Sequence, residues 1–101
     1  MDDSGLLAEG DALAKIKKLL SVVPQIITSD LSVGSTGPQV QLVQLYLLFY
    51  STGQARENLA AASATGYYGS ITEAAILEYQ ENQNILETGE YDAQTRKEMT
   101  Q

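Results

Sequence analysis

Cysteine, histidine and tryptophan are absent from the 101-residue sequence, which also has only one phenylalanine and two prolines. Without cysteine the chain forms no disulfide and has no thiolate nucleophile. Without histidine it lacks the commonest general base and the commonest metal ligand. Serine and threonine hydroxyls therefore have no partner to activate them. We expect no catalytic residue, no metal site, no cofactor and no enzymatic activity.

Positive charge is scarce as well. Six basic residues stand against thirteen acidic ones, and the net charge is −7. Nucleic-acid binding needs clustered lysine and arginine to neutralise phosphates, so this balance argues against a nucleic-acid partner. The basic cluster formed by Lys15, Lys17 and Lys18 lies in the C-terminal half of a predicted helix, where positive charge offsets the helix dipole.

Long apolar runs are missing. Spanning a bilayer takes about 20 consecutive apolar residues, and the run from Leu19 to Ile27 is short and broken by Pro24. The acidic residues Asp2 and Asp3 have the wrong charge for the start of a signal peptide. We predict no membrane span and no signal peptide in this chain, which leaves an intracellular location open.

Apolar periodicity predicts helices over residues 5–23, from Pro38 to about Tyr50, from Ser70 to about Gln83 and over residues 93–99. We expect Pro24 to end the first helix, residues 26–27 to be extended and Asp92 to cap the last helix. Residues 51–64 are polar and rich in alanine. They are predicted to form a connection with one short helical turn around residues 57–62.

The predicted helix from Val40 to Tyr50 is apolar on two sides. One stripe is assigned to the core, and a second consists of Leu42, Leu45, Tyr46 and Phe49. A helix that is apolar nearly all round is buried nearly all round. We infer that the N-terminal helix packs on the second stripe; the alternative is that this stripe is an interface with another protein.

A glycine-bracketed aromatic turn precedes the predicted helix that starts at Ser70. Gly66 and Gly69 can adopt backbone angles that other residues resist, and they flank a pair of tyrosines. We expect Ser70 to be the N-cap and Glu73 to complete a capping box. On the same helix Glu73, Glu78 and Glu81 lie next to amide side chains, a pattern that indicates a solvated face rather than catalytic carboxylates.

The turn has a second, weaker copy. Residues 88–95 align with residues 65–72 at a constant offset and match at threonine, glycine, tyrosine and threonine. A repeat of this size is normally one structural unit that must stack on its neighbour to bury its apolar face. Tyr68 and Tyr91 should therefore be equivalent anchors that point into one shared core.

The ordered set of these residues resembles the peptidoglycan-binding domain of bacterial cell-wall hydrolases and surface proteins. The positions that carry the resemblance are Leu31, Gly34, Gly37, Val40, Val43, Gln44, Leu47, Gly66, Tyr68, Gly69, Thr72, Ala75, Ile76, Tyr79, Gln80, Leu86, Gly89, Tyr91 and Thr95. The resemblance implies an all-α fold, a small three-helix peptidoglycan-binding-domain-like bundle to which this chain adds an N-terminal helix. It divides the chain into an N-terminal amphipathic helix and connector, residues 1–30, and a peptidoglycan-binding-like domain, residues 31–101.

The same resemblance implies a non-catalytic binding module attached to cell-wall peptidoglycan, through the glycan or the stem peptide. Its location would then be the cell envelope, or outside the cell, if the chain is exported. Tyrosine suits sugar rings because it combines a flat apolar body with a hydrogen-bonding tip. We expect Tyr67 to face outward and, with Asn82, Gln83 and Asn84, to line a shallow groove.

A second hypothesis assigns the chain a different kind of partner. The same fold could serve as a protein-docking or assembly subunit of a larger complex. Its contact would be the apolar helix from Val40 to Tyr50 or the N-terminal helix.

Overall fold

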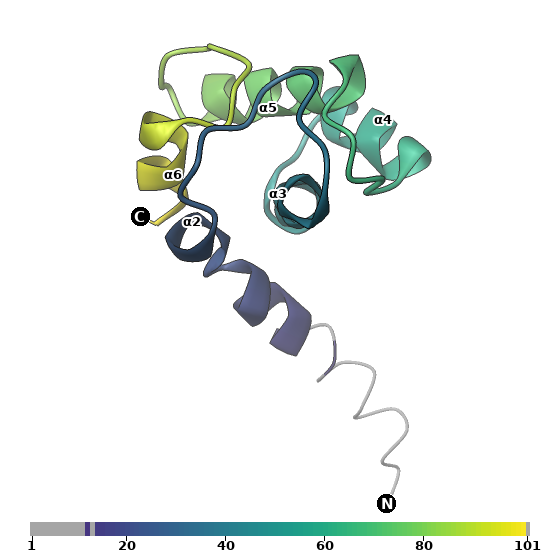
Figure 1. The fold of residues 1–101 in the computed structure, drawn as a ribbon, viewed down its shortest axis with the longest axis vertical. Coiled ribbons are helices and arrows are strands. Elements are labelled where there is room, and N and C mark those ends of the chain that lie inside the picture. Colours follow the sequence, from purple (N-terminus) through teal and green to yellow (C-terminus); the bar gives the residue numbers. More distant parts are fainter. Residues whose placement is uncertain (1–11, 13, 101) are drawn as a thin grey trace, which may run out of the picture.

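The computed structural model describes residue 12 and residues 14–100. Residues 14–20 are helical. They are followed by α2 (Val23–Ile26), α3 (Pro38–Tyr50), α4 (Gln54–Ala62), α5 (Ser70–Asn82) and α6 (Ala93–Met99). In Figure 1, α3 is seen end-on while α5 runs across the view, so these two helices cross steeply. The described residues contain helices and isolated bridges but no strand, which confirms the all-α expectation.

The N-terminal segment differs from its prediction at Pro24 and at Ile26. Pro24 does not end a helix; it lies in the first turn of α2, after a turn at residues 21–22. The first helical turn needs no backbone N–H donor, so proline fits there without losing a hydrogen bond. Ile26 closes α2, and only Ile27 of the expected extended pair is extended. The part of the predicted first helix that falls on residues 5–11 and 13 lies outside the described residues.

One face of this segment belongs to the domain core. Leu20, Val23 and Ile27 are buried among the core side chains, and α2 packs on both α3 and α6. The Tyr50 hydroxyl donates to the Lys17 carbonyl oxygen at 2.6 Å. The N-terminal segment therefore meets α3 at the C-terminal end of that helix, as well as through α2.

The connector before α3 ties the two aromatic turns together. Leu31 and Tyr91 form an antiparallel bridge, each N–H donating to the other residue's carbonyl at 2.9 Å. A few residues later Thr36 pairs with Tyr67 in a second antiparallel bridge. One extended segment thus runs past both turns and holds them in fixed positions relative to each other.

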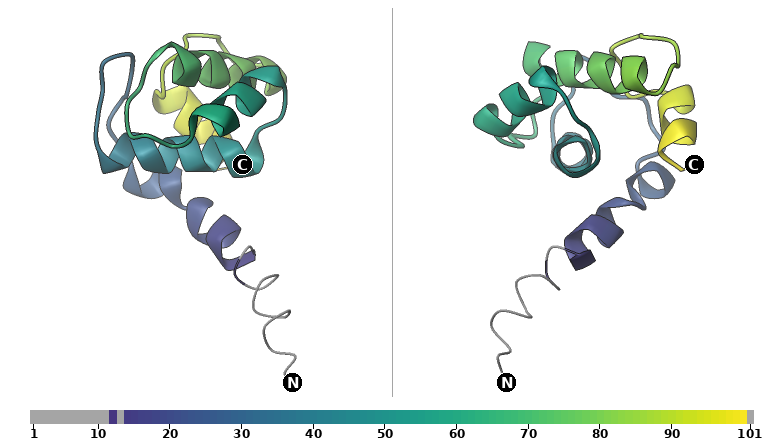
Figure 2. Two further views of the ribbon diagram at one scale, coloured as in Figure 1. Left: turned by 90° about the vertical axis from the view of Figure 1, so that its right-hand side faces the viewer. Right: turned by 180° about the vertical axis from the view of Figure 1, so that it is seen from behind.

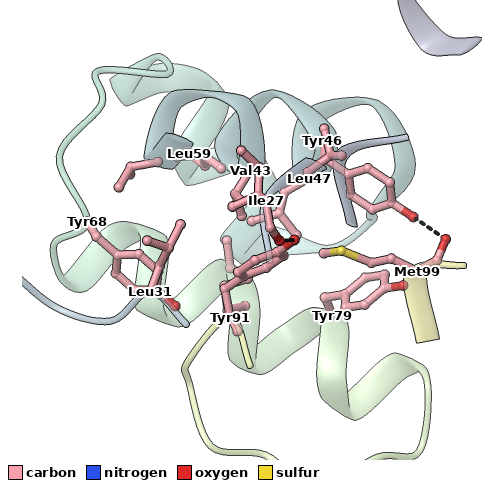
Figure 3. Close-up of a cluster of buried hydrophobic side chains, with 14 of the residues drawn as sticks. Ile27, Leu31, Val43, Tyr46, Leu47, Leu59, Tyr68, Tyr79, Tyr91 and Met99 are labelled. Atoms are coloured by element: carbon pink, nitrogen blue, oxygen red, sulfur yellow. Dashed lines mark hydrogen bonds between the residues drawn. The ribbon is translucent and has the colours of Figure 1, made fainter. Parts of the chain in front are cut away.

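The tyrosine anchors point inward, as the repeat predicted. Tyr68 and Tyr91 are completely buried, and Figure 3 shows both among the side chains of α3, α5 and the connector. The Tyr68 hydroxyl donates to the Gly89 carbonyl at 2.6 Å, and the Tyr91 hydroxyl donates to the Ile27 carbonyl at 2.6 Å. Each turn is therefore bonded to another part of the chain through its buried tyrosine.

The helix α4 is longer than the single turn that the sequence predicts. Its first amides find an acceptor outside the helix, because the Glu78 carboxylate of α5 accepts from Ala55 N–H at 3.0 Å and from Arg56 N–H at 2.9 Å. Leu59 is buried and fixes the middle of the helix in the core. Glu78 is therefore a helix cap supplied by another helix, and its assignment to a solvated face is wrong.

The expected capping box at Ser70 is also wrong. The N-cap of α5 is Gly69, Ser70 is the first helical residue, and no side chain caps this end. The cap of α6 is confirmed, because Asp92 accepts from the Thr95 N–H at 3.1 Å. Gly69 and Asp92 occupy the same place in the repeat. The first turn thus has glycine where the second has a capping carboxylate.

Candidate functional site

The first aromatic turn is held in place by the buried side-chain amide of Gln44. Gln44 of α3 accepts from the Gly66 N–H through Oε1 at 2.9 Å. Its Nε2 donates to the Tyr67 carbonyl at 2.9 Å and to the Thr72 hydroxyl at 2.8 Å. Because three hydrogen bonds converge on one side chain with almost no solvent exposure, the backbone around Tyr67 has a single fixed path.

The second turn is held in the same way. Gln80 of α5 accepts from the Gly89 N–H through Oε1 at 2.9 Å. Its Nε2 donates to the Glu90 carbonyl at 3.0 Å and to the Thr95 hydroxyl at 2.8 Å. The resemblance placed both glutamines among the matching positions, but the sequence alone did not show that each one clamps a turn.

Tyr67 faces outward, as expected, with 55% of its surface exposed. Its ring lies over Gly69, where an added Cβ would come within 2.7 Å of the ring carbon Cε2. Any other residue at Gly69 would therefore displace the ring. Because glycine has no side chain, the Tyr67 ring can lie against the backbone at this position.

A hollow of about 270 Å³ opens beside this ring. The buried side chains of Gln44, Leu59 and Thr72 lie at its base, while Tyr67 and Ile71 are exposed at its edge. Three further hydroxyl-bearing residues line it, namely Ser63, Thr65 and Ser70, and Ala62 and Gly69 complete the lining. The hollow combines apolar surface with hydroxyl groups, the mixture that suits a sugar ring or a short peptide.

The structure does not bring Asn82, Gln83 and Asn84 to this hollow. They lie at the C-terminal end of α5, whereas Tyr67 precedes its N-terminus, and a 13-residue helix is about 20 Å long. Asn82 donates to the Thr52 carbonyl at 3.1 Å, and Asn84 adopts a left-handed conformation in the turn after the helix. The predicted groove that joins all four residues is therefore not formed.

Gln83 lines a different hollow, of about 310 Å³. This second hollow is bordered by Ser21, Tyr46, Tyr50, Tyr79, Gln83, Glu98 and Met99. The rings of Tyr46 and Tyr50 are stacked at 4.6 Å between centroids, and Tyr79 meets Tyr46 edge-on at 6.3 Å. These rings pack chiefly on one another, which indicates a packing role.

The predicted protein interface on α3 is largely taken up by packing. Tyr46 is buried, and its hydroxyl lies 3.5 Å from the Met99 carbonyl (Figure 3). Leu42, Leu45 and Phe49 are half-buried and pack against the core. The physical reason is that α2 packs on α3 and that Met99 of α6 reaches Tyr46. A contact with another protein here stays a prediction.

Several residues of the hollow escaped the sequence analysis. Leu59, Ala62 and Ser63 belong to α4 or its end, a segment predicted to be mostly connection. Ile71 alternates with the buried Thr72 at the start of α5. Its exposure follows from the course of the turn, which the sequence did not specify.

The described residues include no group of three or more acidic, histidine or cysteine side chains that could hold a metal ion. Among the helices that the structure describes, none is long and apolar enough to cross a membrane.

The helices and the two glutamine-held turns form a small all-α domain. The family model described as "Putative peptidoglycan binding domain" matches residues 36–99, and the chain belongs to this family. Membership indicates peptidoglycan as a partner and an association with the cell envelope. No curated protein and no solved structure matches the chain.

Proposed function

We propose that the chain is a non-catalytic module that attaches to bacterial cell-wall peptidoglycan through the hollow beside Tyr67. The observation that carries this proposal is the exposed Tyr67 ring, held above the hollow on a turn fixed by Gln44. A ring that is already in place loses little conformational entropy when a ligand stacks on it.

The chemistry of the hollow favours short-range contacts. Its exposed aromatic and aliphatic groups can cover the apolar face of a sugar ring, while the hydroxyls of Ser63, Thr65 and Ser70 can bond to the ligand's polar groups. Peptidoglycan carries carboxylates, and a protein of net charge −7 gains no long-range attraction from them. We expect weak binding, suited to an accessory module that keeps a larger assembly close to the wall.

Co-sedimentation with insoluble peptidoglycan tests the proposal. The wild-type protein should pellet with the polymer, and Tyr67→Ala should lower the affinity roughly 10-fold, the equivalent of about 1.4 kcal/mol for one stacked ring. Tyr67→Phe keeps the ring and should retain most of the binding. Leu86→Ser is a matched control. Leu86 is a large apolar residue with 72% of its surface exposed, and it does not line this hollow.

Two results would contradict the proposal. Wild-type protein that stays wholly in the supernatant would remove wall binding altogether. Equal pelleting of the wild type and of a correctly folded Tyr67→Ala variant would leave wall binding standing but assign it to another surface.

A further inference from the structure

The N-terminal segment has an uncovered apolar face. We define the N-terminal stripe as Ile16, Leu19, Val22 and Ile26, which recur at intervals of three or four residues and are all exposed. Leu19 is 69% exposed and Ile26 is 59% exposed. Leu20, Val23 and Ile27 already supply the face that enters the core, so the stripe is additional to what the fold needs.

The helical segment that carries the stripe is attached to the domain through Lys17. Figures 1 and 2 show residues 14–20 leading away from the body formed by α3 to α6. The Tyr50 hydroxyl holds the Lys17 carbonyl, and the Lys17 ammonium lies 5.2 Å from the centre of the Tyr50 ring. Lys17 is therefore turned toward the domain, and its contact with Tyr50 sets the orientation of the helix.

Basic residues border the stripe. A shallow hollow of about 340 Å³ is lined by Lys15, Lys18, Leu19 and Val22. Residues 12–29 contain three lysines and no acidic residue, so all thirteen acidic residues of the chain lie elsewhere. The apolar surface is thus combined with positive charge on a protein that is otherwise strongly acidic.

We propose that the N-terminal stripe docks an acidic amphipathic helix of a partner protein. An amphipathic helix presents apolar anchors at the same intervals of three and four residues as the stripe. Glutamate or aspartate side chains beside those anchors would pair with Lys15 and Lys18. This contact lies apart from the hollow beside Tyr67 and does not depend on wall binding.

The charge distribution disfavours two other occupants. Two copies of the chain that paired through their stripes would bring lysines from both helices together, and like charges oppose such a contact. An anionic lipid surface would attract the lysines but repel a protein of net charge −7. The first objection does not arise for an acidic helix. The second is weaker for it, because a short helix meets the local charge of Lys15 and Lys18, whereas an extended lipid surface faces more of the acidic chain.

Binding of synthetic helices to the full chain tests the proposal. The probe is a labelled amphipathic peptide with leucine anchors flanked by glutamates, and its matched control carries lysines in place of the glutamates. Fluorescence anisotropy should show at least 10-fold tighter binding of the acidic peptide, with an affinity that falls as salt is added. The double substitution Lys15→Glu with Lys18→Glu should reverse the preference between the two peptides.

The apolar part of the contact is tested separately. Leu19→Ser with Ile26→Ser should weaken acidic-peptide binding at least 10-fold, while Leu86→Ser, at an equally exposed leucine outside the stripe, should not. Leu19→Ser should also leave co-sedimentation with peptidoglycan unchanged. Conversely, Tyr67→Ala should leave peptide binding unchanged, so the two functions fail independently.

Four outcomes would overturn the proposal. They are equal binding of both peptides, binding of the chain to vesicles of phosphatidylglycerol but not to the acidic peptide, and a dimer of the chain alone that Leu19→Ser abolishes. The fourth is peptide binding that appears only after Asp2, Asp3, Glu9 and Asp11 are neutralised, since it would assign the stripe to the chain's own acidic residues.

Discussion

Gln44 and Gln80 make matching hydrogen bonds to two different turns. Each is a buried amide within a helix, and each accepts from a turn glycine, Gly66 or Gly89, through Oε1 at 2.9 Å. Each also donates to the threonine six residues after that glycine, at 2.8 Å. The sequence repeat is thus accompanied by a second repeat in the helices that support it. The helix that follows the first turn carries the glutamine that holds the second.

Removing either clamp should therefore cost a similar amount of stability. Gln44→Leu keeps the size of the side chain but removes the acceptor of the half-buried Gly66 N–H and a donor to the partly buried Tyr67 carbonyl. We expect a loss of roughly 2 to 3 kcal/mol in the free energy of unfolding, and the same for Gln80→Leu. Urea denaturation followed by circular dichroism measures both.

The control for this pair is Gln41→Leu on the same helix. Gln41 is exposed, and its amide donates to the Ala64 carbonyl at 2.9 Å. Its replacement should change the free energy of unfolding by no more than about 0.5 kcal/mol. A large loss at Gln44 with none at Gln80 would show that the two clamps are not equivalent.

The hydroxyl of Tyr68 joins the first turn to the second. Tyr68→Phe removes the donor to the Gly89 carbonyl at 2.6 Å and leaves that carbonyl buried without it. We expect a loss of about 1 to 2 kcal/mol in the free energy of unfolding, measured by urea denaturation. Tyr67→Phe on the exposed neighbour should be almost neutral, and similar losses in both variants would contradict the assigned roles.

Glu78 should decide whether α4 is stable. Glu78→Ala removes the acceptor for two amides in the first turn of α4, and the loss of such a cap costs about 1 kcal/mol. Amide hydrogen exchange should accelerate across residues 54–62 before it accelerates in α5. Glu81→Ala, at an exposed position on the same helix, should leave the exchange of α4 unchanged.

Alkaline pH should destabilise the fold through its buried tyrosines. Burial raises the pKa of Tyr91 from 10.0 to about 12, and it raises the pKa values of Tyr46, Tyr68 and Tyr79 as well. Below pH 10 these hydroxyls are protonated in both states and stability is complete. Above pH 10 the unfolded chain releases protons that the folded chain retains, so the free energy of unfolding falls as pH rises toward 12.

Urea denaturation at about pH 8 and at about pH 11 measures this loss. Tyrosinate absorbance of the buried rings should rise together with the loss of the helical signal, because ionisation and unfolding are linked. A free energy of unfolding that is the same at both pH values would show that the buried hydroxyls are more accessible than their environment indicates.

Local chemistry made much of the fold predictable. Pro38 marks the start of α3, Asp92 caps α6, and the repeated turn placed Tyr68 and Tyr91 in the core. Each of these features depends on residues close together in the sequence. Pro24 was misjudged because a proline that ends one helix and a proline that begins another have the same local pattern.

The candidate site was less predictable because distant residues assemble it. Tyr67 was correctly expected to face outward, but its neighbours in the hollow come from α3 and α4 as well as α5. Asn82 is at the far end of α5, the helix that begins near Tyr67. Its polar side chain suits a sugar site, but its position in the fold keeps it away from the hollow.

The sequence by itself determined the class of the chain, the positions of α3, α5 and α6 and the two aromatic turns, because periodicity, proline and glycine positions and the internal repeat act over a few residues at a time. Only the tertiary structure decided which helix end Glu78 caps, which turns Gln44 and Gln80 hold, and which apolar faces remain uncovered. The physical reason is that a buried hydrogen bond or a packed face needs a partner from elsewhere in the chain, and that partner is fixed only when the helices are packed together.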